Sequence, residues 1–257
     1  MRMRACVLGS GSGGNSGYVE GREGALLLDA GLPWSRVQRE LWEIGADPGR
    51  IKAILITHEH GDHCSFAGEV ASQLGCPIYA TAGTLAGMAW ALEGLKLDLR
   101  PFTAGDAFQI GGFMVKTFPV FHDAADPCGY IIREGERCLG LVTDLGVLTR
   151  TVLEHLQECD AVILEANHDL EMLRTGPYPW ELKQRIRSEV GHLSNDAAGE
   201  ALAELARRGR LKVALLAHLS RYNNKPELAL QTVKEYLNGR AEVLLTWQDR
   251  RSAVIEL

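Results

Sequence analysis

Three features that mark other protein classes are missing from this sequence. Its 257 residues contain no apolar run approaching the roughly 20 residues that a helix needs to cross a bilayer. The first residues, Met1 to Arg4, lead directly into a short strand-like stretch, without the hydrophobic core of a signal peptide. We therefore expect no membrane association and a cytoplasmic location.

Paired cysteines are also lacking. None of the six cysteines stands in a Cys-x-x-Cys pair, and most lie in or beside apolar, strand-like segments. This pattern favours reduced core residues over a disulfide framework. Only Cys64 lies beside a candidate functional segment, which is described below.

Positive charge is scarce, since 27 Lys and Arg stand against 33 Asp and Glu for a net charge of −6. A surface generally coated by nucleic acid is thereby disfavoured. Residues 171–225 reverse the balance, with ten basic against six acidic residues. This segment predicts either a basic rim beside the site or a solvated helix face. The residues concerned are Arg174, Lys183, Arg185, Arg187, Arg221 and Lys225.

Among the features present, a histidine cluster is the most informative. His58, His60, Asp62 and His63 fall within six residues, between a strand-like run at 53–56 and a helix-like stretch at 65–74. Imidazole and carboxylate ligands suit zinc, manganese or iron, and the absence of cysteine argues against a closed structural zinc site. The segment therefore predicts a metal loop at a strand-to-helix turn, with ligands for two neighbouring cations.

Further ligands are expected just past short apolar strands farther along the chain. His122, Asp144 and His218 each occupy such a position, so all three would line one edge of a sheet. Asp144 is the natural bridging carboxylate, because an anion shared by two dications relieves their repulsion.

The order His-x-His-x-Asp-His, distant His122, Thr143-Asp144 and late Ala217-His218-Leu219-Ser220 resembles the metallo-β-lactamase fold. The alternation of strands and helices indicates two packed sheets with helices outside, in one domain over residues 1–257. The resemblance implies that this α/β chain is a four-layer αββα sandwich. It also implies two divalent ions, Zn²⁺ or Mn²⁺: one held by His58, His60 and His122, the other by Asp62, His63 and His218, with Asp144 bridging.

Finer motifs resemble the WalJ/YycJ-like group, which is associated with DNA exonuclease activity. They are the segments 11–16, 167–169, 178–180 and 191–195. The pattern of Glu165-Ala166, His192-Leu193-Ser194 and His218-Leu219-Ser220 is similar to ribonuclease Z. Both likenesses imply phosphodiester cleavage of a nucleic acid, with DNA as the favoured substrate. Class B β-lactamases carry a cysteine in place of Asp144, and ribonuclease Z carries a long arm absent here, which disfavours antibiotic hydrolysis and transfer RNA processing.

The mechanism we expect is hydrolysis by a metal-activated water, in which two cations also stabilise the attacking and leaving oxygens of a phosphodiester. Asp62 would orient the nucleophile as well as bind metal. His192 would protonate the leaving oxygen or bind the scissile phosphate, with Glu165 as its orienting partner. For His168 and Asp169 a structural role is equally open.

Two other functions remain as alternatives. The same metals could hydrolyse a small thioester or lactone, which the acidic net charge would suit. A non-catalytic, regulatory metal-binding module is disfavoured by the cysteine-free, two-site ligand set.

The remaining predictions concern local structure. Gly9-x-Gly11-x-x-Gly14 fits a dinucleotide-binding fingerprint, but residues 15–20 read as a strand and not as the required helix. A tight turn, or backbone donors for phosphate, is expected there instead. We expect helices at 195–208 and 226–237, a cap at Ser35 and a boundary between two halves near residue 130. His155, in a helical segment, is assigned no role.

Overall fold

The computed structural model describes residues 3–257, which fold into two seven-stranded mixed sheets. The first sheet has the order β14-β1-β2-β3-β4-β5-β6, antiparallel from β14 to β3 and parallel from β3 to β6. Its strands are β1 (Arg4–Gly9), β2 (Ser16–Glu20), β3 (Ala25–Leu28), β4 (Ile51–Leu55), β5 (Ile78–Thr81), β6 (Leu99–Phe102) and β14 (Ile255–Glu256).

The second sheet has the order β13-β12-β11-β10-β9-β8-β7, antiparallel from β7 to β10 and parallel from β10 to β13. Its strands are β7 (Ala107–Ile110), β8 (Phe113–Pro119), β9 (Cys128–Glu134), β10 (Arg137–Val142), β11 (Ala161–Glu165), β12 (Val213–Ala217) and β13 (Glu242–Leu245).

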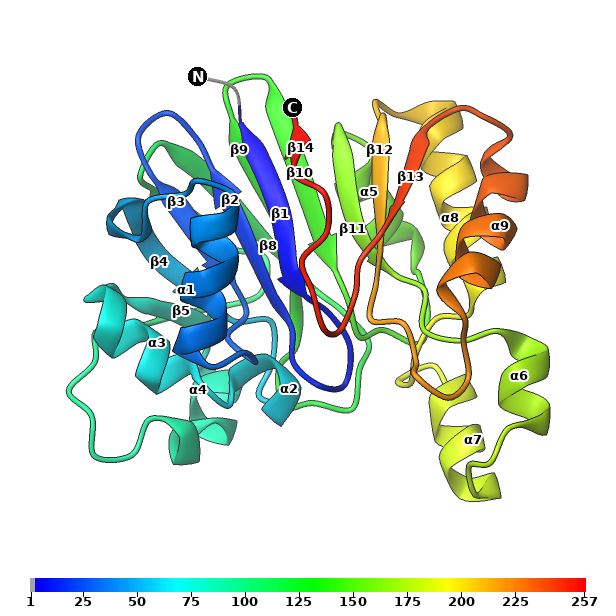
Figure 1. Ribbon diagram of the computed structural model, residues 1–257, viewed down its shortest axis with the longest axis horizontal. Helices are drawn as coiled ribbons and strands as arrows, with labels where there is room; N and C mark the ends of the chain where they lie inside the picture. The colour runs from blue at the N-terminus through cyan, green and yellow to red at the C-terminus, as the bar shows by residue number, and fades with distance from the viewer. Residues whose placement is uncertain (1–2) are drawn as a thin grey trace.

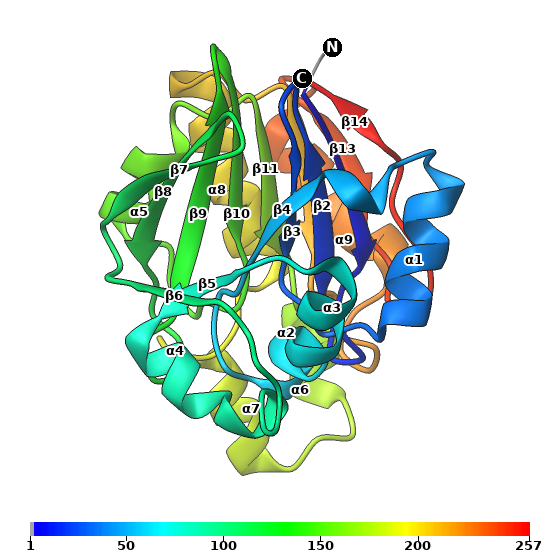
Figure 2. The same ribbon diagram turned by 90° about the vertical axis from the view of Figure 1, so that its left-hand side faces the viewer.

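Helices lie on the outer face of each sheet, as Figure 1 shows. The first sheet is covered by α1 (Trp34–Glu43), α3 (Ala67–Leu74) and α4 (Ala82–Gly87), which Figure 2 presents from outside. The second is covered by α5 (Arg150–Leu156), α8 (Asn195–Arg208) and α9 (Pro226–Leu237). The shorter elements are η1 (Pro48–Arg50), α2 (Gly61–Cys64), η2 (Ala89–Ala91), α6 (Leu170–Thr175) and α7 (Trp180–Arg187).

Three hydrophobic layers hold this arrangement together. Leu55, Tyr130 and Ile163 belong to the cluster between the two sheets. Alternate residues of the same strands point outward, so Leu164 packs with the α8 and α9 side chains, while Ile54 packs with those of α1 and α3. The predicted four-layer αββα sandwich is therefore confirmed.

Several local predictions are also confirmed. The helices at 195–208 and 226–237 have the expected bounds, and Pro226 occupies the first turn of α9. Strand β2 follows the glycine-rich loop directly, which removes the dinucleotide-binding interpretation. All six cysteines are buried and free. Within residues 3–257, no helix is both long and apolar enough to span a bilayer.

Two local predictions are wrong. Pro33 is the N-cap of α1, and Ser35 lies inside the helix. The fixed φ of proline is compatible with the extended backbone that Pro33 adopts as the N-cap. The predicted boundary near residue 130 falls inside β9, which pairs with β8 in one sheet, with Thr117 opposite Tyr130. The chain changes sheets between β6 and β7, at residues 103–106, in a short turn that resembles an ordinary hairpin in sequence.

Candidate metal centre and adjoining pocket

The histidine loop leaves β4 and enters the short helix α2 at one end of the two sheets. Its side chains meet residues that follow β8, β10 and β12 of the other sheet, because the chain emerges from these strands at the same end (Figure 1). The seven proposed metal ligands are thus brought together, as the sequence predicted. Among residues 3–257 they fall into overlapping groups of candidate ligands, two of which are the predicted sets. Asp144 belongs to two further groups, one with His58 and His63 and one with Glu165, His192 and His218.

The first group contains His58, His60 and His122, whose candidate ligand atoms all lie within 4.8 Å of one another. His122 Nδ1 lies 3.2 Å from the carbonyl oxygen of Gly191, and its Nε2 lies 3.3 Å from His60 Nδ1. The carbonyl can only accept, so His122 Nδ1 carries the proton and Nε2 is left as an electron-pair donor facing the other two rings.

The second group contains Asp62, His63 and His218, again with candidate ligand atoms within 4.8 Å. His218 Nε2 lies 3.1 Å from Asp62 Oδ2 and 3.4 Å from Asp144 Oδ1. His63 Nε2 lies 3.1 Å from Asp144 Oδ2, and His122 of the first group lies 3.9 Å from Asp144 Oδ1. One carboxylate therefore contacts both groups.

One buried polar atom tests whether these residues fit metal ions. His58 Nε2 is buried without a hydrogen-bond partner. Leaving such an atom unsatisfied costs about 1–3 kcal/mol, and coordination to a metal ion would satisfy it. Burial and the neighbouring His63 hold the pKa of His58 well below its usual range, so its ring is neutral and has a free electron pair. The nitrogen and oxygen donors fit divalent cations such as zinc or manganese.

Asp29 and Asn15 belong to the site but were missed by the sequence analysis. Asp29 Oδ2 lies 2.7 Å from His63 Nδ1, while its Oδ1 accepts a hydrogen bond from the Thr57 backbone N–H at 2.8 Å. This fixes the His63 ring with Nε2 toward Asp144. Asn15 Nδ2 donates to Asp62 Oδ2 at 3.2 Å. Asp29 directly follows an apolar strand, so the rule that located the other ligands could have located it.

Backbone strain is concentrated in the same place. Asp29, Asp144 and His218 have φ values of 61°, 57° and 53°, and Asn238 is the one other non-glycine residue with positive φ among residues 3–257. Such conformations cost about 1–3 kcal/mol each and persist where the surrounding structure imposes them. Each turns the chain just past a strand end, which directs the side chain into the cluster.

His192 and Glu165, the predicted catalytic pair, are in direct contact. His192 Nδ1 lies 2.6 Å from Glu165 Oε1, and the other carboxylate oxygen accepts from the backbone N–H groups of Leu145 and Leu193. Burial disfavours a charged imidazole, but Glu165 and Asp144 raise the pKa of His192 above its ordinary value. The His192 ring stacks on His218 at 5.2 Å and keeps 19% of its side chain exposed.

The other histidines and Cys64 lie outside this cluster. Asp169 caps α6 by accepting from Met172 N, so its role is structural. Burial lowers the pKa of the adjacent His168 to about 4, which keeps it neutral. His155 stacks on Phe118 as a packing residue. Burial also raises the pKa of Cys64 to about 12, and its thiol donates to the Glu59 carbonyl.

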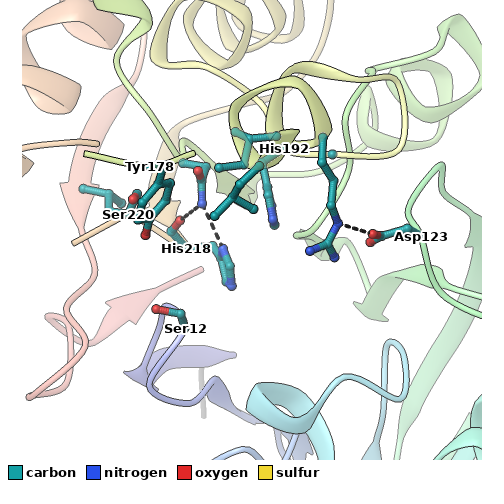
Figure 3. Close-up of a pocket in the computed structure, with 12 residues that line it drawn as sticks. Ser12, Asp123, Tyr178, His192, His218 and Ser220 are labelled. Atoms are coloured by element: carbon teal, nitrogen blue, oxygen red, sulfur yellow. Dashed lines mark hydrogen bonds and ion pairs between the residues drawn. The ribbon is translucent and has the colours of Figure 1, made fainter. Parts of the chain in front are cut away.

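A pocket opens beside His192 and His218 (Figure 3). Ser12 of the glycine-rich loop lies on one side, Tyr178 and Ser220 on a second, and the ion pair of Arg185 with Asp123 on a third. A second pocket, lined by Arg221, Trp247 and Gln248 among others, adjoins the first through Leu219 and Ser220.

The predicted basic rim is present only in part. Arg185 lines the first pocket and Arg221 the second. Arg174, in contrast, pairs with Glu171 on its own helix. Lys183 donates to two backbone carbonyls, those of Arg174 and Gly176. The remaining charge therefore lies mainly on a solvated helix face.

Comparison with known proteins identifies the family. Residues 25–218 match the family described as the beta-lactamase superfamily domain. The chain belongs to this superfamily. It is 37% identical over 241 residues to exodeoxyribonuclease YycJ of Bacillus anthracis, covering 93% of this chain and 91% of that relative. It is 38% identical over 234 residues to exodeoxyribonuclease WalJ of Streptococcus pneumoniae strain D39, covering 90% and 87%.

The solved structures agree on the fold. The metallo-β-lactamase fold protein YhfI from Bacillus subtilis superposes with a TM-score of 0.78 over 100% of both chains, at 17% sequence identity. The resemblance and the fold predicted from the sequence are confirmed. Together with the superfamily match and the two relatives, the histidine and aspartate cluster establishes this chain as a metal-dependent hydrolase.

Proposed function

We propose that this hydrolase is a dinuclear phosphodiesterase that acts on DNA as an exonuclease. The observation that carries the proposal is the position of Asp144 between the two ligand groups. Its Oδ2 lies 3.1 Å from His63, and its Oδ1 lies 3.4 Å from His218 and 3.9 Å from His122. A shared anion between two ligand groups suits a pair of cations. DNA is supported as the substrate by the two exodeoxyribonucleases that match nearly the whole chain.

In this proposal one cation is held by His58, His60 and His122, and the other by Asp62, His63 and His218, with Asp144 shared. When bound, two such cations lower the pKa of a water molecule and offset the negative charge of the phosphodiester. The chain's own residues then supply orientation and proton transfer.

Asp62 is the proposed hydrogen-bond acceptor that orients the attacking water. Its side chain keeps 23% exposure, whereas that of Asp144 keeps 3%. Asn15 and His218 contact its Oδ2 and thereby fix the orientation of the carboxylate. An oriented acceptor lowers the entropic cost of aligning the nucleophile.

His192 is the proposed proton donor to the leaving oxygen. Because Glu165 occupies its Nδ1, the opposite nitrogen Nε2 is available to the pocket that His192 lines. The raised pKa keeps the ring protonated at a higher pH than an unperturbed histidine, as a general acid requires.

The test is turnover of end-labelled single-stranded and double-stranded DNA by metal-stripped protein refilled separately with Zn²⁺ or Mn²⁺. Progressive shortening by the wild type, and none by Asp62→Ala protein, is the expected result. Intact DNA with both metals bound, together with hydrolysis of a thioester or lactone panel, would replace the nuclease proposal by the small-molecule alternative.

A further inference from the structure

Tyr178 lines the pocket and Tyr222 packs against Tyr178, and neither ring contributes to the hydrophobic core. Tyr178 lies in the loop between α6 and α7, and Tyr222 lies in the loop between β12 and α9. Their ring centroids are 5.8 Å apart at an interplanar angle of 60°. Neither ring belongs to the three hydrophobic clusters found in residues 3–257. Tyr222 is 59% exposed, which is unusual for a large ring with only a core-packing role.

Tyr178 places this pair of rings beside the site of the proposed chemistry. Tyr178 lines the same pocket as His192 and His218, and Figure 3 shows it beside Ser220 on one side of that space. Tyr222 follows Ser220 by two residues and packs on Tyr178. If the reacting group of a ligand lies at His218, a planar group next to that reacting group would therefore be within reach of these rings.

Two buried asparagines hold the Tyr222 loop in place, and one of them packs on the Tyr178 loop. The carbonyl of buried Asn223, which follows Tyr222, accepts from the Asp169 backbone N–H at 2.9 Å. Its side-chain oxygen lies where a Cβ on Gly176 would clash, so this loop packs closely on the loop that carries Tyr178. Asn224 Nδ2 donates to the carbonyls of Ala166 and Asn167 at 2.9 and 3.0 Å. The rings are thus mounted on rigid supports, which reduces the entropy lost when a ligand stacks on them.

Charge beside the rings favours a polyanionic ligand over an apolar one. Arg221 directly precedes Tyr222 and lines the adjoining pocket, where its guanidinium donates to the neutral amide of Gln248. Its positive charge is therefore not neutralised by that contact. Aromatic faces next to a cationic side chain suit single-stranded nucleic acid, because every base has a face on which to stack and the charge attracts the backbone.

We propose that Tyr178 and Tyr222 form a stacking platform for one unpaired nucleobase of the DNA strand, next to the phosphate at the metal cluster. This inference rests on the proposed function, since it assigns the platform to the same DNA substrate. The platform selects for an unpaired terminal nucleotide and is tolerant of sequence. A paired base would be shielded by its neighbours in the duplex, so strand ends that fray would enter first.

The experiment is a cycle that pairs a change in the protein with a change in the DNA. Wild-type and Tyr222→Leu proteins, both metal-loaded, are titrated with a fluorescent single strand whose phosphorothioate links resist cleavage. Each of its three terminal nucleotides is replaced in turn by an abasic residue. Cleavage of the same sequence with ordinary phosphodiester links is measured in parallel.

At one position, removing the base should weaken wild-type binding roughly tenfold, as should Tyr222→Leu with the intact strand. The two changes together should weaken binding no more than either change alone, because they remove the same contact. Tyr178→Leu should behave alike, and Tyr222→Phe should retain wild-type affinity. Trp42→Leu, which alters another ring that is 80% exposed on α1, is the matched control and should change nothing.

The outcomes separate this inference from the proposed function. If the losses of affinity from Tyr222→Leu and from base removal add at all three positions, the platform is overturned, even if the wild type shortens DNA. Coupled losses in binding with no cleavage by the wild type would leave the platform standing and overturn the nuclease proposal. No binding of any strand would overturn both.

Discussion

Glu165 is a carboxylate with no exposed surface, and both of its oxygens have partners. Two backbone N–H groups and His192 Nδ1 compensate the cost of burying its charge. Burial would raise the pKa of Glu165, but His192 lowers it, so the pair stays ionised. Glu165 Oε1 lies 2.6 Å from His192 Nδ1 and 3.4 Å from His218 Nδ1, so this buried carboxylate fixes the orientation of both pocket histidines, the proposed proton donor included.

This arrangement predicts different effects on metal binding and turnover. His192→Ala should lower turnover about 10²- to 10⁴-fold, because it removes the proposed proton donor, while leaving the metal content near that of the wild type. Metal content is measured on the purified protein and turnover on end-labelled DNA. His155→Ala is the histidine control, and its turnover should match the wild type. Loss of metal in step with activity would assign His192 to metal binding instead.

The sequence identified most residues of this site because their spacing is local or follows a positional rule. His58 to His63 lie on one loop, and His122, Asp144 and His218 each follow an apolar strand. Asn15 could not be found this way. Its contact with Asp62 joins residues 47 positions apart and depends on how one loop packs on another.

At the scale of elements, the glycine-rich loop before β2 supports the metal loop by close backbone packing. A Cβ on Gly31, which follows Asp29 and Ala30, would lie 1.7 Å from the Asp62 carbonyl oxygen and 2.8 Å from the Asn15 nitrogen. The Asn15 N–H in turn donates to the Asp62 carbonyl at 2.7 Å. No side chain fits between these three backbone segments, so the glycine is required by space.

Gly31→Ala should therefore displace Asp62 and weaken metal binding. We expect a loss of about 1–3 kcal/mol in the free energy of unfolding, as for other overpacked sites, and a lower metal affinity in competition with a chelator. Gly13→Ala is the matched control, because its added Cβ would meet only Gln248 Oε1, at 3.4 Å. Wild-type metal affinity in Gly31→Ala protein would show that the metal loop does not depend on this contact.

The elements with strong periodicity were predicted well, and the errors fall where sequence patterns are ambiguous. Helix α8 has small and apolar residues on one face, and its bounds were predicted correctly. Ser35 resembles a cap in the sequence, but Pro33 is the N-cap of α1. Strands β8 and β9, the second of which contains residue 130, are similarly apolar, so their pairing within one sheet could not be distinguished from a boundary.

At the scale of the whole molecule, the proposed ligands join the two halves of the sandwich. The histidine loop belongs to the first sheet, whereas His122, Asp144 and His218 follow strands of the second. The core cluster between the sheets, which includes Tyr130 and Leu55, holds the halves together from within. Bound cations would add a second link at the rim of the same interface.

Removal of the metal should therefore lower the thermal stability of the whole chain. A ligand at a hundredfold excess over its Kd stabilises the native state by about 2.7 kcal/mol. For a chain of this size that corresponds to a Tm about 5 to 10 °C higher for each cation. The measurement is calorimetry of the stripped and the refilled protein. Stripped Asp144→Ala protein is the control, and its Tm should not change when metal is added. Equal Tm values for the stripped and refilled wild type would contradict the link.

The sequence by itself indicated the alternating strands and helices and the residues of the candidate metal cluster, because local periodicity and motif spacing depend on short stretches of chain. The layered fold was implied by the resemblance of its motifs to a known family. Tertiary structure alone decided which residues support these features. Asp29 orients His63, Asn15 contacts Asp62, and Tyr178 meets Tyr222 through contacts between segments far apart in the chain. The position of the sheet change at residues 103–106 was decided in the same way, since pairing partners are chosen by packing across the core and not by the strand's own composition.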